Sequence, residues 1–353
     1  MKRYTTAWLN DVLVTLFMEA GASREVSETT SSILIEGDLL GHHTHGIKLA
    51  NGYLRDLKSG HACGDHTALS VKKISPVAAV FDGHYILGPY LVQQALEQSA
   101  TAAQQSGIGI VSIKRSHHIA CLASYLQPFV EQGLMPIIMT SDPAVKSVAP
   151  FGGVEPVYTP NPIAMGIPSR VQPILMDVSM STVTNGSVAK AHAEKNQLAH
   201  PVILANTGLA SDNPADFFSD PQGSILPLGG MEFGHKGFAM GLMVEALTSA
   251  LAGYGRKDEP SGWGASVTVM VIDPTLFAGK STFLDETDHL VSACLDSAAI
   301  DPKRPVRMPG QAGLARKEAY LEQGIPLPSD VLTELKKAID DSSLKGCMGA
   351  ARP

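Results

Sequence analysis

Two histidine clusters contain the residues whose types and spacing are best suited to chemistry. His42, His43 and His45 lie within the segment GHHTHGIKLANGYL, and His117 and His118 are adjacent in RSHHIACLASY. Imidazole titrates near neutral pH, so such residues can transfer protons, bind a metal ion or simply fill a core. Spacing alone leaves all three roles open.

A zinc-dependent hydrolase is one interpretation of these clusters. Such a site needs three protein ligands and an open position, which His43, His45 and His118 could supply. However, the chain contains no HExxH pattern, and its four cysteines form no CxxC pair. We therefore expect no catalytic metal and keep the hydrolase as a rival hypothesis.

Two further segments carry polar groups beside apolar elements. Asp177 follows an apolar strand in PILMDVS, where a carboxylate can orient an imidazole or cap a helix. The segment FGHKGF places His235 and Lys236 between glycines just before a long apolar helix. A helix N-terminus with a lysine can bind phosphate, although the glycines could also serve close packing alone.

Two nucleotide-binding motifs are absent from the sequence. There is no GxxxxGK[ST] loop, and no strand is followed by GxGxxG opening a helix. A P-loop site and a Rossmann-type dinucleotide fold are therefore not supported.

The elements that must position these residues alternate between helix and strand. Residues 5–60 are expected to be helical, with Gly21 ending one helix and Ser23 capping the next. Strands are expected at 77–83, 108–114, 135–141, 173–179 and 266–273, and helices at 89–105, 119–132, 182–196 and 234–253. This order predicts an α/β fold with a covered sheet in residues 76–282, possibly as two subdomains. Residues 1–75 together with 283–353 are expected to form a mainly helical lobe.

Composition excludes several classes of function. The 353 residues are 44% hydrophobic and 17% charged, with a formal net charge of −7, so no basic patch indicates nucleic acid binding. No apolar run reaches the roughly eighteen residues of a membrane span. Asp11 and Glu19 interrupt the N-terminal apolar stretch, which favours an amphipathic helix over a secretion signal and predicts a cytoplasmic protein.

Four segments, taken in order, resemble the malate/L-lactate dehydrogenase family. They are GHHTHGIKLANGYLRDLKSG, PVYTPNPIAMGIPS with LMDVSMSTV, LPLGGMEFGHKGFAMGLMVEAL, and MPGQAGLAR. The family also contains sulfolactate, ureidoglycolate and diketogulonate oxidoreductases and reductases of cyclic imino acids. The resemblance implies a non-Rossmann α/β fold with a mixed central sheet that binds NADP or NAD, and a homodimer with active sites near the subunit interface.

The resemblance also assigns roles to individual residues. His45 matches the expected proton donor, Asp177 would orient or charge-balance it, and His118 would lie near substrate and nicotinamide. Thr44, Lys48 and His118 would contact a small carboxylate substrate. The residues expected to bind the cofactor are Ser116, Ser141, Asn161, Pro162, Ser179, Ser181, His235, Lys236, Gly237, Gly310 and Gln311.

Departures from the family pattern affect the substrate. Leu49 stands where many members carry an arginine suited to a substrate carboxylate, and leucine cannot replace a bidentate guanidinium contact. The expected activity is hydride transfer between NAD(P)H and C2 of a small 2-oxo or 2-hydroxy acid, with histidine as proton donor or acceptor. A reductase of cyclic imino acids such as piperideine- or pyrroline-2-carboxylate is the alternative, and a non-catalytic nucleotide-binding protein is the rival from another class.

Overall fold

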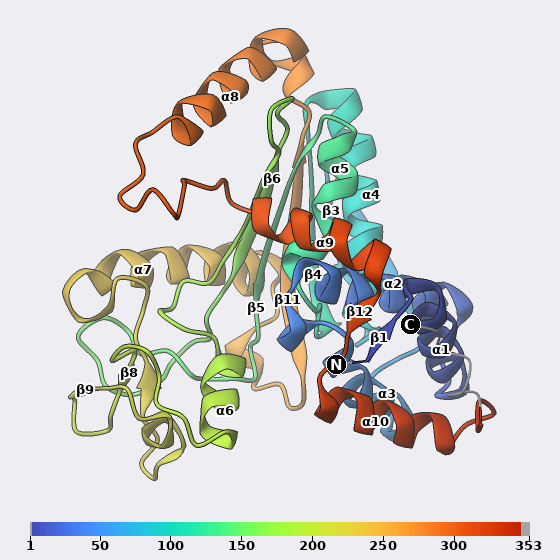
Figure 1. The fold of residues 1–353 in the computed structure, drawn as a ribbon. Coiled ribbons are helices and arrows are strands. Elements are labelled where there is room, and N and C mark those ends of the chain that lie inside the picture. Colours follow the sequence, from blue (N-terminus) through green and yellow to red (C-terminus); the bar gives the residue numbers. More distant parts are fainter. Residues whose placement is uncertain (1, 347–353) are drawn as a thin grey trace.

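A computed structural model describes residues 2–346 and shows an α/β fold around a mixed seven-stranded sheet (Figure 1). The strands in sheet order are β2 (Ser70–Ser75), β3 (Ala78–Asp82), β4 (Ile108–His117), β11 (Gly264–Ile272), β5 (Met135–Ser141), β6 (Ile163–Ile167) and β7 (Ile174–Val178). Within this sheet, as described for residues 2–346, β3 and β4 run parallel and the other neighbouring pairs are antiparallel. The expected mixed sheet is therefore confirmed.

The central strand β11 shows why the sheet is covered on both faces. Val267, Val269 and Val271 are fully buried in the main core, which they share with α4 (Gly88–Ser106). On the opposite face, the alternate residue Thr268 donates a hydrogen bond to the carbonyl of Leu247, in the π-helical turn Ala246–Ala250 that continues α7 (Gly230–Glu245). Period-two alternation thus presents each face of the strand to a different helix.

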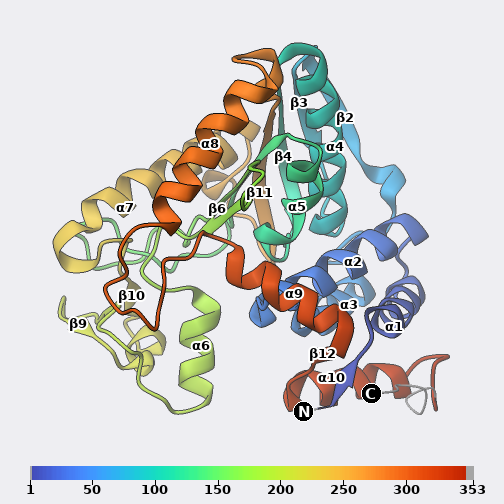
Figure 2. The ribbon, with the colours of Figure 1, turned by 45° about the horizontal axis from the view of Figure 1, so that its top comes forward.

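Helices from the N-terminal and C-terminal parts of the described chain form a group beside the sheet. These helices are α1 (Thr6–Glu19), α2 (Arg24–Leu40), α3 (Ala50–Ser59), α9 (Gln311–Gln323) and α10 (Ser329–Asp340). β1 (Arg3–Tyr4) pairs with β12 (Ile325–Pro326), which joins the N-terminal segment to the C-terminal one. α8 (Lys280–Leu295) lies apart from this group (Figure 2) and packs Val291 against Ile174 of β7. The division into a lobe of residues 1–75 with 283–353 and a region of residues 76–282 stays a prediction.

A smaller unit flanks β7. It contains α6 (Asn185–Ala193) and a three-stranded sheet in the order β10 (Ser224–Ile225), β8 (Ile203–Leu204) and β9 (Ala210–Ser211). Val148, Tyr158 and Val188 form its separate apolar core with residues of this sheet. The unit forms one wall of the cavity described below.

Most predicted elements are confirmed, and three need correction. Residues 119–132 are not one helix, because a 3₁₀ turn at Leu122–Tyr125 precedes the short α5 (Gln127–Glu131). The helix expected at 234–253 begins earlier, at Gly230. The helix expected at 182–196 is confined to Asn185–Ala193, since Thr184 caps it. No helix in residues 2–346 is long and apolar enough to cross a membrane.

Candidate active site

A cavity of about 500 Å³ lies where several strands of the main sheet end. It is lined by the turn after α2, the loop after β4, the C-terminal end of β5, the loop before β6, the end of β7, the start of α6 and the start of β11. Of the residues predicted from the sequence, it brings together Thr44, His45, His118, Ser141, Asn161, Pro162, Asp177 and Ser179. Leu49 also lines it, at the position where the resemblance leads us to expect an arginine.

His45 lies in the cavity wall and is oriented by its neighbour. Its Nδ1 is 2.9 Å from the hydroxyl oxygen of Thr44. Burial, and to a smaller extent the proximity of His42, holds the pKa of His45 below its ordinary value of 6.5. The ring is therefore mainly neutral at pH 7 and can accept a proton.

His118 faces His45, with their ring centroids 6.0 Å apart. The backbone N–H of Ala120 donates to His118 Nδ1 at 3.3 Å, and the Tyr53 hydroxyl lies 2.8 Å from the same nitrogen. Because Nδ1 accepts, the neutral ring carries its proton on Nε2. Trp263 stacks on the ring at 4.4 Å, and burial holds the pKa of His118 well below its ordinary value. His118 is therefore a fixed, uncharged hydrogen-bond donor.

Asp177 lines the same cavity but makes different contacts from those expected. Its Oδ2 accepts a hydrogen bond from the Ala123 N–H at 2.9 Å and lies 3.7 Å from the Cys121 sulfur. Within residues 2–346 it makes no hydrogen bond to His45, and the histidine that affects its charge is His42. Burial raises the pKa of Asp177. No direct contact between Asp177 and His45 supports its expected role in orienting His45, and that role stays a prediction.

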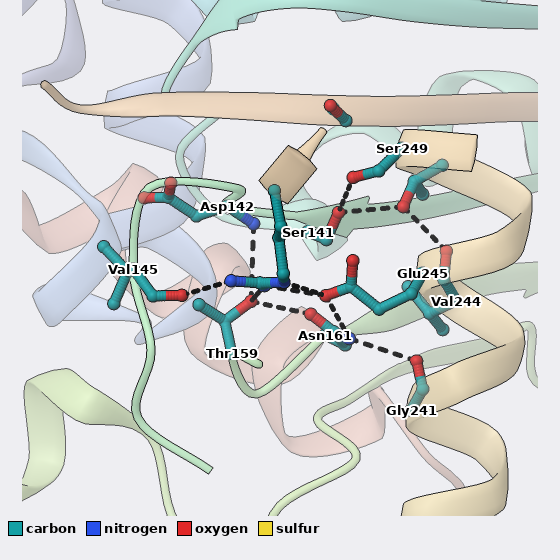
Figure 3. A network of polar contacts seen from close by, with 12 residues as sticks. Ser141, Asp142, Val145, Thr159, Asn161, Gly241, Val244, Glu245 and Ser249 are labelled. Atoms are coloured by element: carbon teal, nitrogen blue, oxygen red, sulfur yellow. Dashed lines mark hydrogen bonds and ion pairs between the residues drawn. The ribbon is translucent and has the colours of Figure 1, made fainter. Parts of the chain in front are cut away.

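A polar network behind the cavity holds Ser141 and Asn161 (Figure 3). The Ser141 hydroxyl lies 2.9 Å from those of Thr248 and Ser249. The Asn161 amide nitrogen donates to the Gly241 carbonyl at 3.1 Å and to Glu245 Oε1 at 3.0 Å. Both side chains form hydrogen bonds with other residues of the protein, and these bonds fix the shape of the cavity wall.

Arg256 donates hydrogen bonds to two parts of this network. It donates to Glu245 Oε1 from Nε at 3.0 Å and from Nη2 at 2.7 Å, and to the Val145 carbonyl from Nη1 at 2.5 Å. One guanidinium thus joins α7 to the loop that follows β5.

A second cavity, of about 970 Å³, adjoins the first. His42 and Asp177 line both. The second cavity also contains Gly310 and four cationic side chains, which are Lys303, Arg304, Arg307 and Arg316. Their charge makes it suited to an anionic group.

Several predicted residues lie outside the first cavity. The Ser116 hydroxyl donates to the His117 carbonyl at 2.7 Å, and that of Ser181 donates to the Val183 carbonyl at 2.8 Å. Lys48 extends toward Asp330, 3.6 Å away. Gln311 accepts from the Met308 N–H at 3.0 Å, near the second cavity. The structure gives these four side chains internal or surface partners.

The expected helix N-terminus at His235, Lys236 and Gly237 is wrong, because α7 begins at Gly230 and these residues lie in its second turn. Their expected role in binding the cofactor stays a prediction. His235 and Lys236 are exposed, whereas Gly237 is buried and packs so closely on the backbone of Leu228 that a Cβ there would lie 2.4 Å from it.

Some cavity and support residues, including Tyr53, Trp263, Asn185 and His42, were not identified from the sequence as functional. Tyr53 and Trp263 hold His118, and Asn185 and His42 line the cavity. Tyr53 lies eight residues after His45 in the quoted histidine segment, and Trp263 is one of two tryptophans in the chain. The sequence does not reveal that either residue contacts His118, because that contact forms only in the folded chain.

Comparison with known proteins places the chain in a family. The sequence model described as Malate/L-lactate dehydrogenase matches residues 4–336. The chain belongs to the malate/L-lactate dehydrogenase family. It is therefore an oxidoreductase of a family that uses a nicotinamide cofactor.

Individual members of the malate/L-lactate dehydrogenase family match nearly the whole chain. A malate dehydrogenase of Pyrococcus horikoshii is 26% identical over 95% of this chain and 94% of its own. A Delta(1)-pyrroline-2-carboxylate/Delta(1)-piperideine-2-carboxylate reductase of Pseudomonas syringae pv. tomato is 30% identical over 89% of this chain and 88% of its own. The crystal structure of malate dehydrogenase from Entamoeba histolytica superposes with a TM-score of 0.90 at 20% identity, covering 96% of this chain and 98% of the other, which establishes the shared fold.

Proposed function

We propose that this protein transfers a hydride between NADP or NAD and C2 of a small 2-oxo or 2-hydroxy acid, with His45 as the proton donor in reduction. The observation that carries the proposal is the pairing of His45 with His118 in one cavity, with ring centroids 6.0 Å apart. The nicotinamide supplies or accepts the hydride, and the protein orients the reactants and handles the proton.

The cavity residues fit such a cofactor. Asn185 Oδ1 is buried and has no hydrogen-bond partner within residues 2–346, although the residue lines the first cavity. A buried oxygen without a donor is costly, so a ligand amide would satisfy it. The adjoining cationic cavity suits the phosphates of the same dinucleotide, with Arg304 and Arg307 as the side chains that would contact them.

His45 and His118 would have different roles at the substrate, proton exchange and hydrogen-bond donation. His45 Nδ1 is held by the Thr44 hydroxyl, which leaves Nε2 to exchange the proton with the oxygen on C2. His118 is held by Tyr53 and carries its own proton on Nε2, so it can donate a hydrogen bond to a substrate oxygen without a change of charge. Asp177 contributes negative charge to the same cavity when it is ionised.

One observation favours cyclic imino acids as the alternative substrates. Among the described residues lining the first cavity there is no lysine or arginine, and Leu49 and Trp263 present apolar surface. A carboxylate would then be held by hydroxyl and amide donors such as Thr44, Thr184 and Asn185, and the indole would contact a ring. This setting suits piperideine- or pyrroline-2-carboxylate.

The direct test is turnover by wild type and His45→Ala. We expect wild type to oxidise NADPH or NADH in the presence of a 2-oxo acid or a cyclic imino acid. We expect His45→Ala to lower kcat by about 10²–10⁴-fold while cofactor binding is largely kept, because general acid catalysis contributes about that factor. His61→Ala, an exposed histidine outside the cavity, is the control. A rate in His45→Ala equal to that of wild type would remove His45 from this role.

Cofactor binding without turnover would support the rival hypothesis of a non-catalytic nucleotide-binding protein. If wild type binds NADPH but reduces neither 2-oxo acids nor cyclic imino acids, a non-catalytic nucleotide-binding protein becomes the better interpretation. A metal-dependent hydrolase would instead lose activity to a chelator, which we expect this enzyme to tolerate.

A further inference from the structure

Three different metal-binding groups meet at the junction of the two cavities. A ring nitrogen of His42, the thiol of Cys121 and a carboxylate oxygen of Asp177 all lie within 4.8 Å of one another. They come from the turn after α2, the loop after β4 and the end of β7, three segments that the fold brings together. The sequence shows no metal-binding motif here, because the ligands are far apart along the chain.

The donor types suit a divalent ion of the zinc class. Imidazole and thiolate are preferred ligands of zinc, and a carboxylate commonly completes such a site. With metal–ligand bonds of about 2.0–2.3 Å, tetrahedral geometry places the ligand atoms roughly 3.3–3.8 Å apart. His42 is exposed and makes no side-chain hydrogen bond within residues 2–346, so its ring is free to move the remaining distance.

The charge balance at Asp177 also favours a cation. The carboxylate is largely buried, yet the groups that contact its Oδ2 are a neutral N–H and a neutral thiol. Burial raises the pKa of this carboxyl, and the nearby His42 only partly opposes that shift. An ion bound between His42 and Asp177 would add positive charge beside the carboxylate.

We propose that His42, Cys121 and Asp177 bind one divalent transition-metal ion of the zinc class, with the fourth position open to water from the cavities. The thiol releases its proton to solvent as the sulfur coordinates the ion. Burial raises the pKa of the Cys121 thiol to about 12, so this deprotonation lowers the net affinity. The ion plays no part in hydride transfer.

The position of this site implies that a bound ion would interfere with cofactor binding. His42 and Asp177 line both cavities, so an ion held between them occupies the passage that an extended dinucleotide would use. This second step rests on the proposed function. We therefore expect the metal to inhibit by competing with NADPH or NADH.

Cobalt(II) titration of the full chain tests metal binding without any use of activity. We expect one equivalent to bind wild type, with a thiolate-to-cobalt charge-transfer absorption and the visible bands of a tetrahedral ion. The charge-transfer absorption should be lost in Cys121→Ser and kept in Cys63→Ser, which changes a thiol outside both cavities. His42→Ala, at an exposed position, should weaken binding at least tenfold. The proposal is overturned if wild type binds no stoichiometric cobalt, or if Cys121→Ser keeps the same charge-transfer absorption.

NADPH binding in the presence and absence of zinc tests the competition. We expect zinc to weaken NADPH binding to wild type at least tenfold and to leave binding to Cys121→Ser unchanged. If metal and NADPH bind together without interference, the ion does not obstruct the passage, and the competition is wrong. Failure of wild type to bind NADPH without zinc would instead count against the proposed function, and the cobalt result would stand by itself.

Discussion

At the residue scale, the orientation of His45 depends on Thr44. The Thr44 hydroxyl lies 2.9 Å from His45 Nδ1, whereas Asp177 is bonded to Ala123 and contacts Cys121. A hydroxyl fixes the ring through a hydrogen bond without adding charge. The pKa of His45 is lowered mainly by burial and to a smaller extent by His42, and the Thr44 hydroxyl adds no negative charge that would raise it.

Thr44→Val tests this pairing, because valine keeps the shape of threonine and removes its hydroxyl. We expect kcat to fall by roughly 3–10-fold, since a hydrogen bond contributes about 0.5–1.5 kcal/mol net. Thr44→Ser should restore most of the loss. Cofactor dissociation constants and the melting temperature are measured alongside kcat. A Thr44→Val enzyme with wild-type kcat would show that the hydroxyl does not orient His45.

The lowered pKa of His45 also determines the pH dependence. Reduction needs the protonated imidazole and oxidation needs the neutral one. With a pKa below 6.5, we expect the reduction rate to fall as pH rises through that pKa and on toward neutrality. Oxidation of the hydroxy acid should rise through the same pKa and reach a plateau by neutral pH. Profiles of kcat/KM in both directions measure this, and an inflection clearly above pH 6.5 would contradict the assigned cause.

The sequence could predict some site residues but not those that support them. His45, His118 and Asp177 could be predicted because they lie in segments that resemble a known family, and all three line one cavity. Tyr53 and Trp263 could not, because they act by packing against His118 across the fold. Lys48 looked suited to a substrate carboxylate beside Leu49, yet its side chain extends toward Asp330.

At the scale of elements, one ion pair joins the cavity wall to α7. Arg256 and Glu245 are each less than one-fifth exposed, and their contact is 2.7 Å. Arg256 also donates to the Val145 carbonyl, so its loss would leave Glu245 with the Asn161 amide but without its cationic partner, and would remove the Arg256 donor from that carbonyl.

Arg256→Met should therefore destabilise the protein. Removing one partner of a buried pair costs about 3–5 kcal/mol, and partial exposure reduces this to roughly 1–3 kcal/mol. Arg24→Met is the matched control, because Arg24 and Glu28 form an exposed pair in α2 whose loss should cost about 0–1 kcal/mol. Urea unfolding measures both, and equal effects of the two substitutions would contradict this reading of the network.

Elements with strong patterns could be predicted, and elements set by long-range pairing could not. β4, β5 and β11 follow apolar β-rich runs, and α2 begins after Ser23 as its cap predicts. β2 was missed because every one of its six residues is exposed, so no buried face marks it. The start of α7 was placed four residues late, because Gly229 and Gly230 resemble loop residues although α7 begins at the second of them.

At the scale of the whole molecule, α7 leaves apolar surface uncovered. The exposed apolar side chains on it are Met231, Phe233, Met240, Leu242 and Met243, and Leu251 follows directly after the turn that continues it. Phe233 and Leu242 are 55% and 50% exposed. Apolar side chains gathered on one helix indicate a contact with another protein surface. We propose that a second copy of this chain covers it, as the family resemblance implies.

Leu242→Glu tests this proposed dimer. A charge on the face that the second copy would cover should raise the dimer dissociation constant at least tenfold, which corresponds to about 1.4 kcal/mol or more. Leu321→Glu, which changes an exposed leucine on α9, is the control. Sedimentation equilibrium gives the dissociation constants. A wild-type protein that is monomeric, or a dimer unaffected by Leu242→Glu, would contradict this interface.

The most direct test of the central claim follows the hydride itself. Wild type is supplied with NADPH or NADH that carries deuterium at the transferred position, together with 2-oxo acids and cyclic imino acids. Mass spectrometry and NMR of the product then locate the label. We predict one deuterium at C2 of the reduced acid, formed far more slowly by His45→Ala. A product without deuterium at C2, or no product from any member of either substrate class, would contradict it.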